Sequence, residues 1–203
     1  QGRAPRADRG QDTEPGDCTV HYSHTLHGAP PPAGGLGHDE RARRTIYACF
    51  GPPSLFAALH PAGQRYDSRV ACLRALKAIG YRVGTGVMIG LPGQTLGDLV
   101  DDLFFFRDIG ADMIGMGPYI PHAQAVQPGS IPDAPTRVGL ALRMIAATRL
   151  LLPSINIAAT TALQTLAPEG REQGLRYGAN VIMPQATPLH VRRNYTLYDG
   201  KPC

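Results

Sequence analysis

The stretch that decides the fold is Gly80-Tyr81-Arg82-Val83-Gly84-Thr85-Gly86-Val87-Met88-Ile89-Gly90-Leu91-Pro92-Gly93-Gln94-Thr95. Its first part is apolar and strand-compatible and predicts a buried strand, and the glycine and proline residues that follow predict a tight turn. Thr95 is a residue type that caps helix N-termini, and Asp98 places a carboxylate in the first turn of the next helix. The stretch therefore predicts a strand, a turn and a helix in succession.

A helix and a second strand extend this unit. Apolar residues recur at intervals of three and four and predict the buried face of the helix: Leu96, Leu99, Val100 and Leu103. The acidic residues nearby are expected to lie outside that face: Asp98, Asp101 and Asp102. Residues 112–117 then predict a strand. Residues 81–117 thus form a β-α-β unit with an expected right-handed crossover.

The rest of the chain repeats this alternation. Strands are expected near residues 86, 115, 157 and 181, and helices over residues 55–60, 67–79, 136–151 and 168–177. Ser54 is expected to cap the first of these helices, and Pro168 to be the first residue of the last. The buried stripe of the 67–79 helix is expected to consist of Val70, Leu73, Leu76 and Ile79. The alternation predicts an α/β fold with parallel strands.

Two observations favour a (β/α)8 TIM-type barrel over a doubly wound sheet. Polar, glycine and proline residues follow each strand, where they would line one mouth of a barrel: Gly90–Gly93, Pro121–His122, Thr160–Thr161 and Pro184. No dinucleotide-binding glycine pattern is complete, because Ile89 stands where its third glycine belongs. Nor is the turn a phosphate loop, because Gln94 replaces the required lysine. With 203 residues, the chain is shorter than the about 250 residues of a complete barrel, and its pattern accounts for about four parallel β/α units.

Composition excludes several classes of function. The formal net charge is +4, but the basic residues are scattered and lack interleaved aromatic residues, so nucleic-acid binding is not expected. No apolar run reaches the about 18 residues of a membrane span, and no secretory leader is visible. The four cysteines are widely spaced: Cys18, Cys49, Cys72 and Cys203. They form no C-x-x-C pair, so a zinc ribbon is excluded and a reducing, intracellular setting is expected.

The amino-terminal segment differs from the rest. Residues 1–50 carry arginine, glycine and proline without periodicity, so we expect them to be disordered or unrelated to a barrel domain over residues 51–203. A short apolar run over residues 46–50 is a candidate strand. His21, His24 and His27 have spacing that suits a metal ion, but nothing nearby would hold them rigid, so no metal site is assigned.

Six segments, taken in order, carry a resemblance to a known family. They are Gly90–Thr95, Asp98–Leu103, Gly115–His122, Asn156–Ala162, Gly178–Pro184 and Tyr195–Cys203. Together they resemble the radical S-adenosylmethionine (SAM) maturases of [FeFe]-hydrogenase, the HydE family, over about residues 54–203. The resemblance implies a (β/α)8 TIM-type barrel, of which this chain would be the carboxyl half, with about four parallel β/α units. It also implies SAM and a [4Fe-4S] cluster as cofactors, and an iron–cysteine complex as the substrate in assembly of the hydrogenase di-iron subcluster.

The resemblance also implies roles for individual residues. Arg69 is similar to the arginine that holds the SAM carboxylate, a role that suits the two-pronged guanidinium group. Barrel-mouth positions that wall the SAM site are matched by Met88, Met113, Ile120 and Met183. Thr160 and Thr161 resemble threonines that bind an anion or a substrate carboxylate; on a strand, they would point in opposite directions. Tyr195 and Tyr198 resemble tyrosines near the reaction space.

The sequence departs from the family where the cluster would be bound. The family holds its cluster with a C-x3-C-x2-C loop, which this sequence lacks, so no metal ligand is assigned. The leading hypothesis is a truncated maturase, complemented by a chain that carries the amino half. The alternative is a non-catalytic half-barrel remnant or interaction module. A different barrel enzyme using Asp98, Asp101, Asp102 or His122 is disfavoured, because those carboxylates are expected on the outer face of a helix.

Partners and compartment follow from the same resemblance. It implies a small-molecule substrate and other hydrogenase maturation proteins as partners, with no nucleic acid and no membrane. It implies a cytoplasmic location, or a plastid if the source is an alga.

Overall fold

The computed structural model describes residues 21–22, 45–49, 51–60, 63–121 and 130–183. The strands are β1 (His21–Tyr22), β2 (Thr45–Cys49), β3 (Arg82–Ile89), β4 (Met113–Pro118), β5 (Asn156–Ala159) and β6 (Val181–Ile182). The helices are α2 (Pro53–Leu59), α3 (Tyr66–Ala78), α4 (Leu96–Asp108), α5 (Ala134–Leu151), α6 (Thr161–Leu166) and α7 (Gly170–Arg176). No helix in these ranges combines the length and the apolar character needed to cross a membrane.

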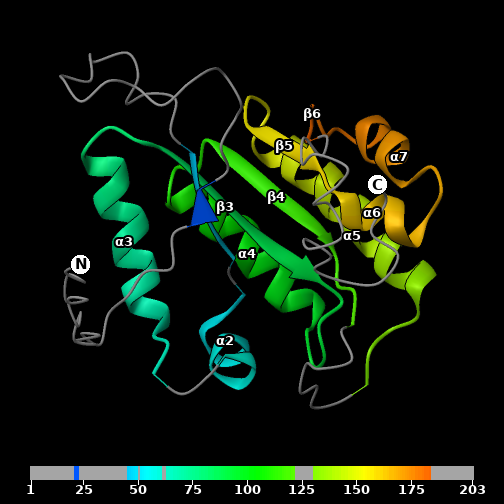
Figure 1. The fold of residues 1–203 in the computed structure, drawn as a ribbon, viewed down its shortest axis with the longest axis horizontal. Coiled ribbons are helices and arrows are strands. Elements are labelled where there is room, and N and C mark those ends of the chain that lie inside the picture. Colours follow the sequence, from blue (N-terminus) through cyan, green and yellow to red (C-terminus); the bar gives the residue numbers. More distant parts are fainter. Residues whose placement is uncertain (1–20, 23–44, 50, 61–62, 122–129, 184–203) are drawn as a thin grey trace, which may run out of the picture.

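The described strands form one six-stranded sheet in the order β1-β2-β3-β4-β5-β6. β1 is antiparallel to β2, and every other neighbouring pair is parallel. The order rises along the sheet without reversal, as Figure 1 shows for the labelled strands. A doubly wound sheet has a reversal, whereas a barrel does not. The predicted parallel α/β units are therefore confirmed, and their order is compatible with half of a barrel.

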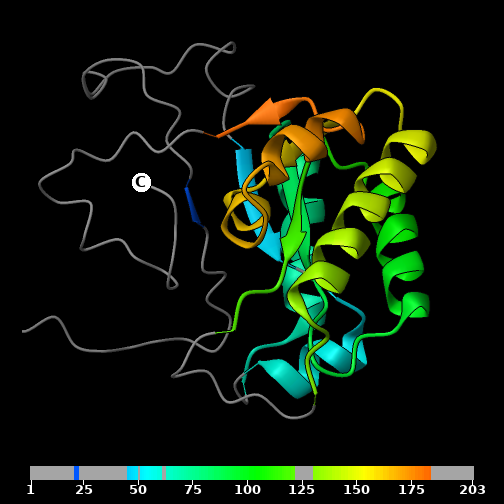
Figure 2. The same cartoon turned by 90° about the vertical axis from the view of Figure 1, so that its right-hand side faces the viewer.

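The core lies between the sheet and the helices that cover one of its faces. In Figure 2, α4 and α5 lie side by side on that face. Alternate residues of β3 point into the core, because successive side chains of a strand face opposite ways. Val83, Val87 and Ile89 are buried there, whereas Met88 is exposed. Met88 therefore lies on the face of the sheet opposite α4 and α5.

The helix-starting signal after β3 is confirmed. The Thr95 side chain accepts a hydrogen bond from the Asp98 backbone, and the Asp98 carboxylate accepts one from the Thr95 backbone. This reciprocal pair is a capping box, which satisfies two backbone donors at the helix start. It fixes the direction in which α4 leaves the carboxyl end of β3.

Two predicted helix faces are partly wrong. Ile79 is 65% exposed, because α3 ends at Ala78 and the chain turns away at Gly80, where φ is +87°. On α4, Leu96 and Val100 are exposed, whereas Leu99, Asp102 and Phe106 are buried. The inward side of α4 thus follows positions 99, 102 and 106, a spacing of three and four that includes an acidic residue.

Several predicted boundaries are also wrong. Pro52, not Ser54, is the N-cap of α2, which therefore starts without a side-chain cap. The helix expected over 168–177 begins at Gly170, so Pro168 is not its first residue. The last strand is shorter than expected and holds Val181 and Ile182.

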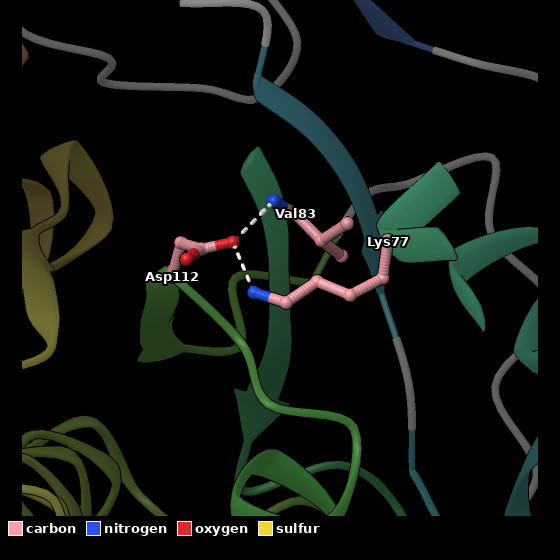
Figure 3. Close-up of polar contacts among 3 residues, drawn as sticks. All are labelled: Lys77, Val83 and Asp112. Atoms are coloured by element: carbon pink, nitrogen blue, oxygen red, sulfur yellow. Dashed lines mark hydrogen bonds and ion pairs between the residues drawn. The ribbon is translucent and has the colours of Figure 1, made fainter. Parts of the chain in front are cut away.

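Side chains tie the amino ends of the strands together. Asp112 Oδ2 accepts hydrogen bonds from Lys77 Nζ at 2.6 Å and from the Val83 backbone at 2.8 Å, as Figure 3 shows. Asn180, just before β6, makes a similar contact with β5, where its Oδ1 accepts a hydrogen bond from the Ile157 backbone amide at 2.8 Å. In each case, the residue just before one strand accepts a hydrogen bond from a backbone amide near the start of the neighbouring strand. These contacts stabilise the amino edge, whereas ligands of such folds bind at the carboxyl edge.

Candidate functional site at the carboxyl edge

Three neighbouring strands bring Met88, Gly117 and Thr160 together. Met88 pairs with Gly117 across β3 and β4. A Cβ atom on Gly117 would lie 2.2 Å from Thr160 Oγ1, so the glycine leaves the space that the threonine hydroxyl occupies. That hydroxyl donates to the Met116 carbonyl at 3.3 Å. The arrangement places a thioether and a hydroxyl on the face of the sheet opposite α4 and α5, near the carboxyl ends of the strands.

The predicted setting of the two threonines is wrong. β5 ends at Ala159, so Thr160 is the N-cap of α6 and Thr161 is its first helical residue. They are therefore not adjacent strand residues pointing in opposite directions. α6 was not predicted, because it is a six-residue helix with no side-chain cap.

The turn after β3 is built around the Gln94 side chain. Its Oε1 accepts from the backbones of Gly90 at 2.7 Å and Leu91 at 3.3 Å, and its Nε2 donates to the Met88 carbonyl at 3.1 Å. The Gly90 and Leu91 amides are therefore already engaged. This supports the prediction that the turn is not a phosphate loop, since such a loop offers its backbone amides to the ligand.

Ile120 and Met183 follow strands and so lie at the carboxyl edge. Ile120 is half-buried two residues after β4, and the preceding Tyr119 amide donates to the Ile89 carbonyl at 2.8 Å. Met183 follows β6 directly and is exposed. Met113 differs, because it is the first residue of β4 and pairs with Gly84 near the amino edge. The mouth position expected for Met113 is therefore wrong.

Arg69 lies on α3 and is held by two neighbours. Its Nη2 donates to Gln64 Oε1 at 2.9 Å, and its guanidinium carbon lies 5.2 Å from the centre of the Phe56 ring. Lys77, near the end of the same helix, reaches Asp112 at the amino edge. Arg69 therefore lies about two turns closer to the carboxyl edge than Lys77.

The remaining predicted residues lie outside the described ranges: Tyr195, Tyr198, His122 and the side chains of His21, His24 and His27. Within those ranges, no group of three or more histidine, cysteine, aspartate or glutamate side chains is placed to hold a metal ion. A [4Fe-4S] cluster is held by cysteine thiolates. Cys72, on α3, is the cysteine whose side chain the structure describes, and a single thiol in the described residues does not fit a cluster.

The burial of two charged residues was not predicted from the sequence. Arg137 is 7% exposed, in the first turns of α5, and its Nη1 donates to the Tyr119 carbonyl. Asp102 is 3% exposed on α4, and its Oδ2 has no hydrogen-bond partner. The burial of both could have been predicted from their helical position. Arg137 lies on the same face of its helix as buried Ala141, and Asp102 on the same face as buried Phe106.

Burial raises the pKa of Asp102 to about 7, and repulsion from Asp98 and Asp101 adds to the shift. The same carboxyl lies close enough to Tyr66 to raise the pKa of that phenol, after the larger effect of burial. The prediction that Asp102 lies on the outer face of its helix is therefore wrong. It still lies on a helix in the core and not at a strand end, so it is not placed to act on a ligand at the carboxyl edge.

Comparison with known proteins gives one clear similarity. Over 154 residues, the chain is 49% identical to the [FeFe] hydrogenase maturase subunit HydE of Thermotoga maritima. The aligned part is 74% of this chain and 42% of the relative, so the chain spans less than half of the relative's length. No family model matches the chain.

Proposed function

Because the chain is a HydE-like sequence that corresponds to the carboxyl-terminal part of that maturase, we propose that it supplies the carboxyl half of a radical SAM maturase barrel. The observation that carries the proposal is the 49% identity, together with the sequential order of parallel strands. The proposed role is in assembly of the [FeFe]-hydrogenase di-iron subcluster. The proposed substrate is an iron–cysteine complex, and other maturation proteins are the proposed partners.

The carboxyl edge offers groups of the right chemistry for SAM. Met88, Ile120 and Met183 would wall the cofactor with apolar surface, and Arg69 would bind its carboxylate by charge-assisted hydrogen bonds. Met113, at the start of β4, would line the barrel interior farther from the mouth. Thr160 and Thr161, at the start of α6, would bind the substrate carboxylate. Tyr195 and Tyr198, from the tail of the chain, would lie near the reacting atoms.

The cluster is assigned to the other half of the barrel. The described residues do not offer the thiolates that it needs, so no step through the cluster is derived for this chain. The proposed complement is a segment that carries a C-x3-C-x2-C loop and pairs with the open edges of this sheet. A reducing cytoplasmic setting suits such chemistry, and nothing favours a plastid.

The proposal is tested by SAM cleavage. The chain is reconstituted with iron and sulfide, alone and together with the amino-terminal part of Thermotoga maritima HydE, and 5′-deoxyadenosine is measured. We expect none above background from the chain alone and turnover from the combination. Arg69→Met should raise the SAM concentration that gives half-maximal rate by about 10- to 100-fold, since a hydrogen-bonded charge pair contributes about 1.5–3 kcal/mol.

Arg74→Met is the matched control, because Arg74 is an exposed arginine on the same helix. It should leave SAM cleavage unchanged. An inactive combination of folded halves would instead support the alternative, a half-barrel remnant or interaction module. Product from the chain alone would show that the cluster assignment is wrong.

A further inference from the structure

We propose that Arg137 is a positioning residue, which holds the segment after β4 against the turn after β3 and so sets the shape of the carboxyl edge. The inference rests on the proposed function in one respect, since Ile120 in that segment is expected to contact SAM. Arg137 itself does not touch the proposed ligand in this assignment. Its role is to fix the backbone that presents Ile120.

The stem of Arg137 packs against the turn after β3. Gly90 has a φ of +82°, and a Cβ atom there would lie 2.4 Å from Arg137 Cγ. The close approach of backbone to side chain is thus available to glycine alone. The methylene groups of Arg137 fill the space beside the turn, which fixes the distance between α5 and the end of β3.

The head of Arg137 binds the segment after β4. Its Nη1 donates to the Tyr119 carbonyl, while the Tyr119 amide donates to the Ile89 carbonyl at 2.8 Å. Both backbone polar groups of Tyr119 are therefore engaged, one to α5 and one to β3. Ile120 is the next residue, so its backbone starts from a fixed point.

Burial of the Arg137 side chain lowers the stability of the fold, and its contact with the Tyr119 carbonyl explains why an arginine is found at this position. Arg137 is 7% exposed and its buried Nε has no hydrogen-bond partner. A buried charge with unmet donors destabilises a fold unless another effect offsets it. An apolar residue in phase with Ala141 would pack as well, but it could not bind the Tyr119 carbonyl.

A second arginine on α5 makes similar contacts at the other edge. Arg149 donates to the carbonyls of Pro153, Ile155 and Gly178 at 2.7–2.8 Å. Those residues precede β5 and β6, at the amino edge that Asp112 and Asn180 also stabilise. Arg137 differs because it acts at the carboxyl edge, where the proposed ligand binds.

Amide hydrogen exchange of the whole chain tests the proposal. Arg137→Met keeps an apolar stem and removes the donors, and Arg143→Met is the matched control at an exposed position of the same helix. We expect the Tyr119 amide to exchange about tenfold faster in Arg137→Met, with the Ile157 amide unchanged. Arg137→Lys, which keeps one donor, should restore slow exchange in part.

Two results would overturn the proposal. One is an unchanged Tyr119 amide in a folded Arg137→Met variant, and the other is equal acceleration of the Tyr119 and Ile157 amides, which would indicate general destabilisation. If Arg137→Met does not fold, nuclear magnetic resonance of the unaltered chain decides. Arg137 should show separate Nη resonances from hindered rotation, whereas averaged resonances like those of Arg143 would contradict the contact.

A readout of function separates this inference from the proposed function. In the two-part barrel, Arg137→Met should raise the SAM concentration for half-maximal rate with little change in maximal rate. The reason is that the substitution loosens the backbone that carries Ile120. An unaltered combination that does not cleave SAM would refute the proposed function. The hydrogen-exchange measurement would still test the positioning role of Arg137, because it needs neither SAM nor the cluster.

Discussion

Asp102 shows at the scale of one residue how a buried carboxyl links stability to pH. Its pKa is raised to about 7 by burial first and then by Asp98 and Asp101. The protonated form is therefore favoured in the folded state, and an unfolded aspartate has a pKa near 3.9. The contribution of Asp102 to the free energy of unfolding should be largest below about pH 4 and should be lost as the pH rises to about 7, a change of up to about 4 kcal/mol.

Asp102→Asn removes this titration. Urea unfolding between pH 4 and 8 should show that the stability difference between the variant and the unaltered chain changes in favour of the variant as the pH rises. Asp108→Asn, at an exposed position of the same helix, should keep the pH dependence of the unaltered chain. A pH-independent difference for Asp102→Asn would mean that Asp102 is ionised in the folded state at low pH.

What the sequence reveals at this scale depends on whether an interaction is local. The capping box between Thr95 and Asp98 was predictable, because its two residues are three positions apart and satisfy each other. Helical phase could indicate that Arg137 is buried, but its contacts were not predictable, because its partners Tyr119 and Gly90 lie far away along the chain. Its polar side chain also contradicts the usual rule that buried helix positions are apolar.

The contact in Figure 3 connects α3, β3 and β4, so it tests how whole elements are joined. Asp112→Ala removes the acceptor of the Val83 amide and should lower the free energy of unfolding by about 1–3 kcal/mol. Lys77→Met removes a partly exposed ion pair and should cost no more than about 1 kcal/mol.

Asp112→Asn is the matched variant, because its side-chain oxygen can still accept from the Val83 amide. Urea unfolding at one pH measures all three variants. Equal losses for Lys77→Met and Asp112→Ala would show that the ion pair, and not the backbone contact, stabilises the amino edge.

Long elements were predictable from periodicity, and short ones were not. α4 and α5 are 13 and 18 residues long, so their apolar residues recur over several helical turns and the period can be recognised. α6 has six residues and β6 has two, too few for a repeat to be distinguished. Their existence depends on packing, such as that of Gly170 and Gly174 against Leu163.

At the scale of the whole molecule, the described strands form one open sheet, parallel from β2 to β6, whose carboxyl edge carries the candidate site. The order of the strands followed from the alternation of strands and helices, since consecutive β-α-β units place each new strand beside the last. The assembly of the site did not follow in full. Helical phase and strand ends decide whether a residue such as Met113 lies at the mouth or near the amino edge.

Electron paramagnetic resonance after anaerobic reconstitution with iron and sulfide tests most directly whether this chain is a partial maturase. The chain is measured alone and with the amino-terminal part of Thermotoga maritima HydE, with and without SAM. We expect no [4Fe-4S] signal from the chain alone and, from the combination, a signal that shifts when SAM is added. A SAM-sensitive signal from the chain alone, or none from the folded combination, would contradict the proposal.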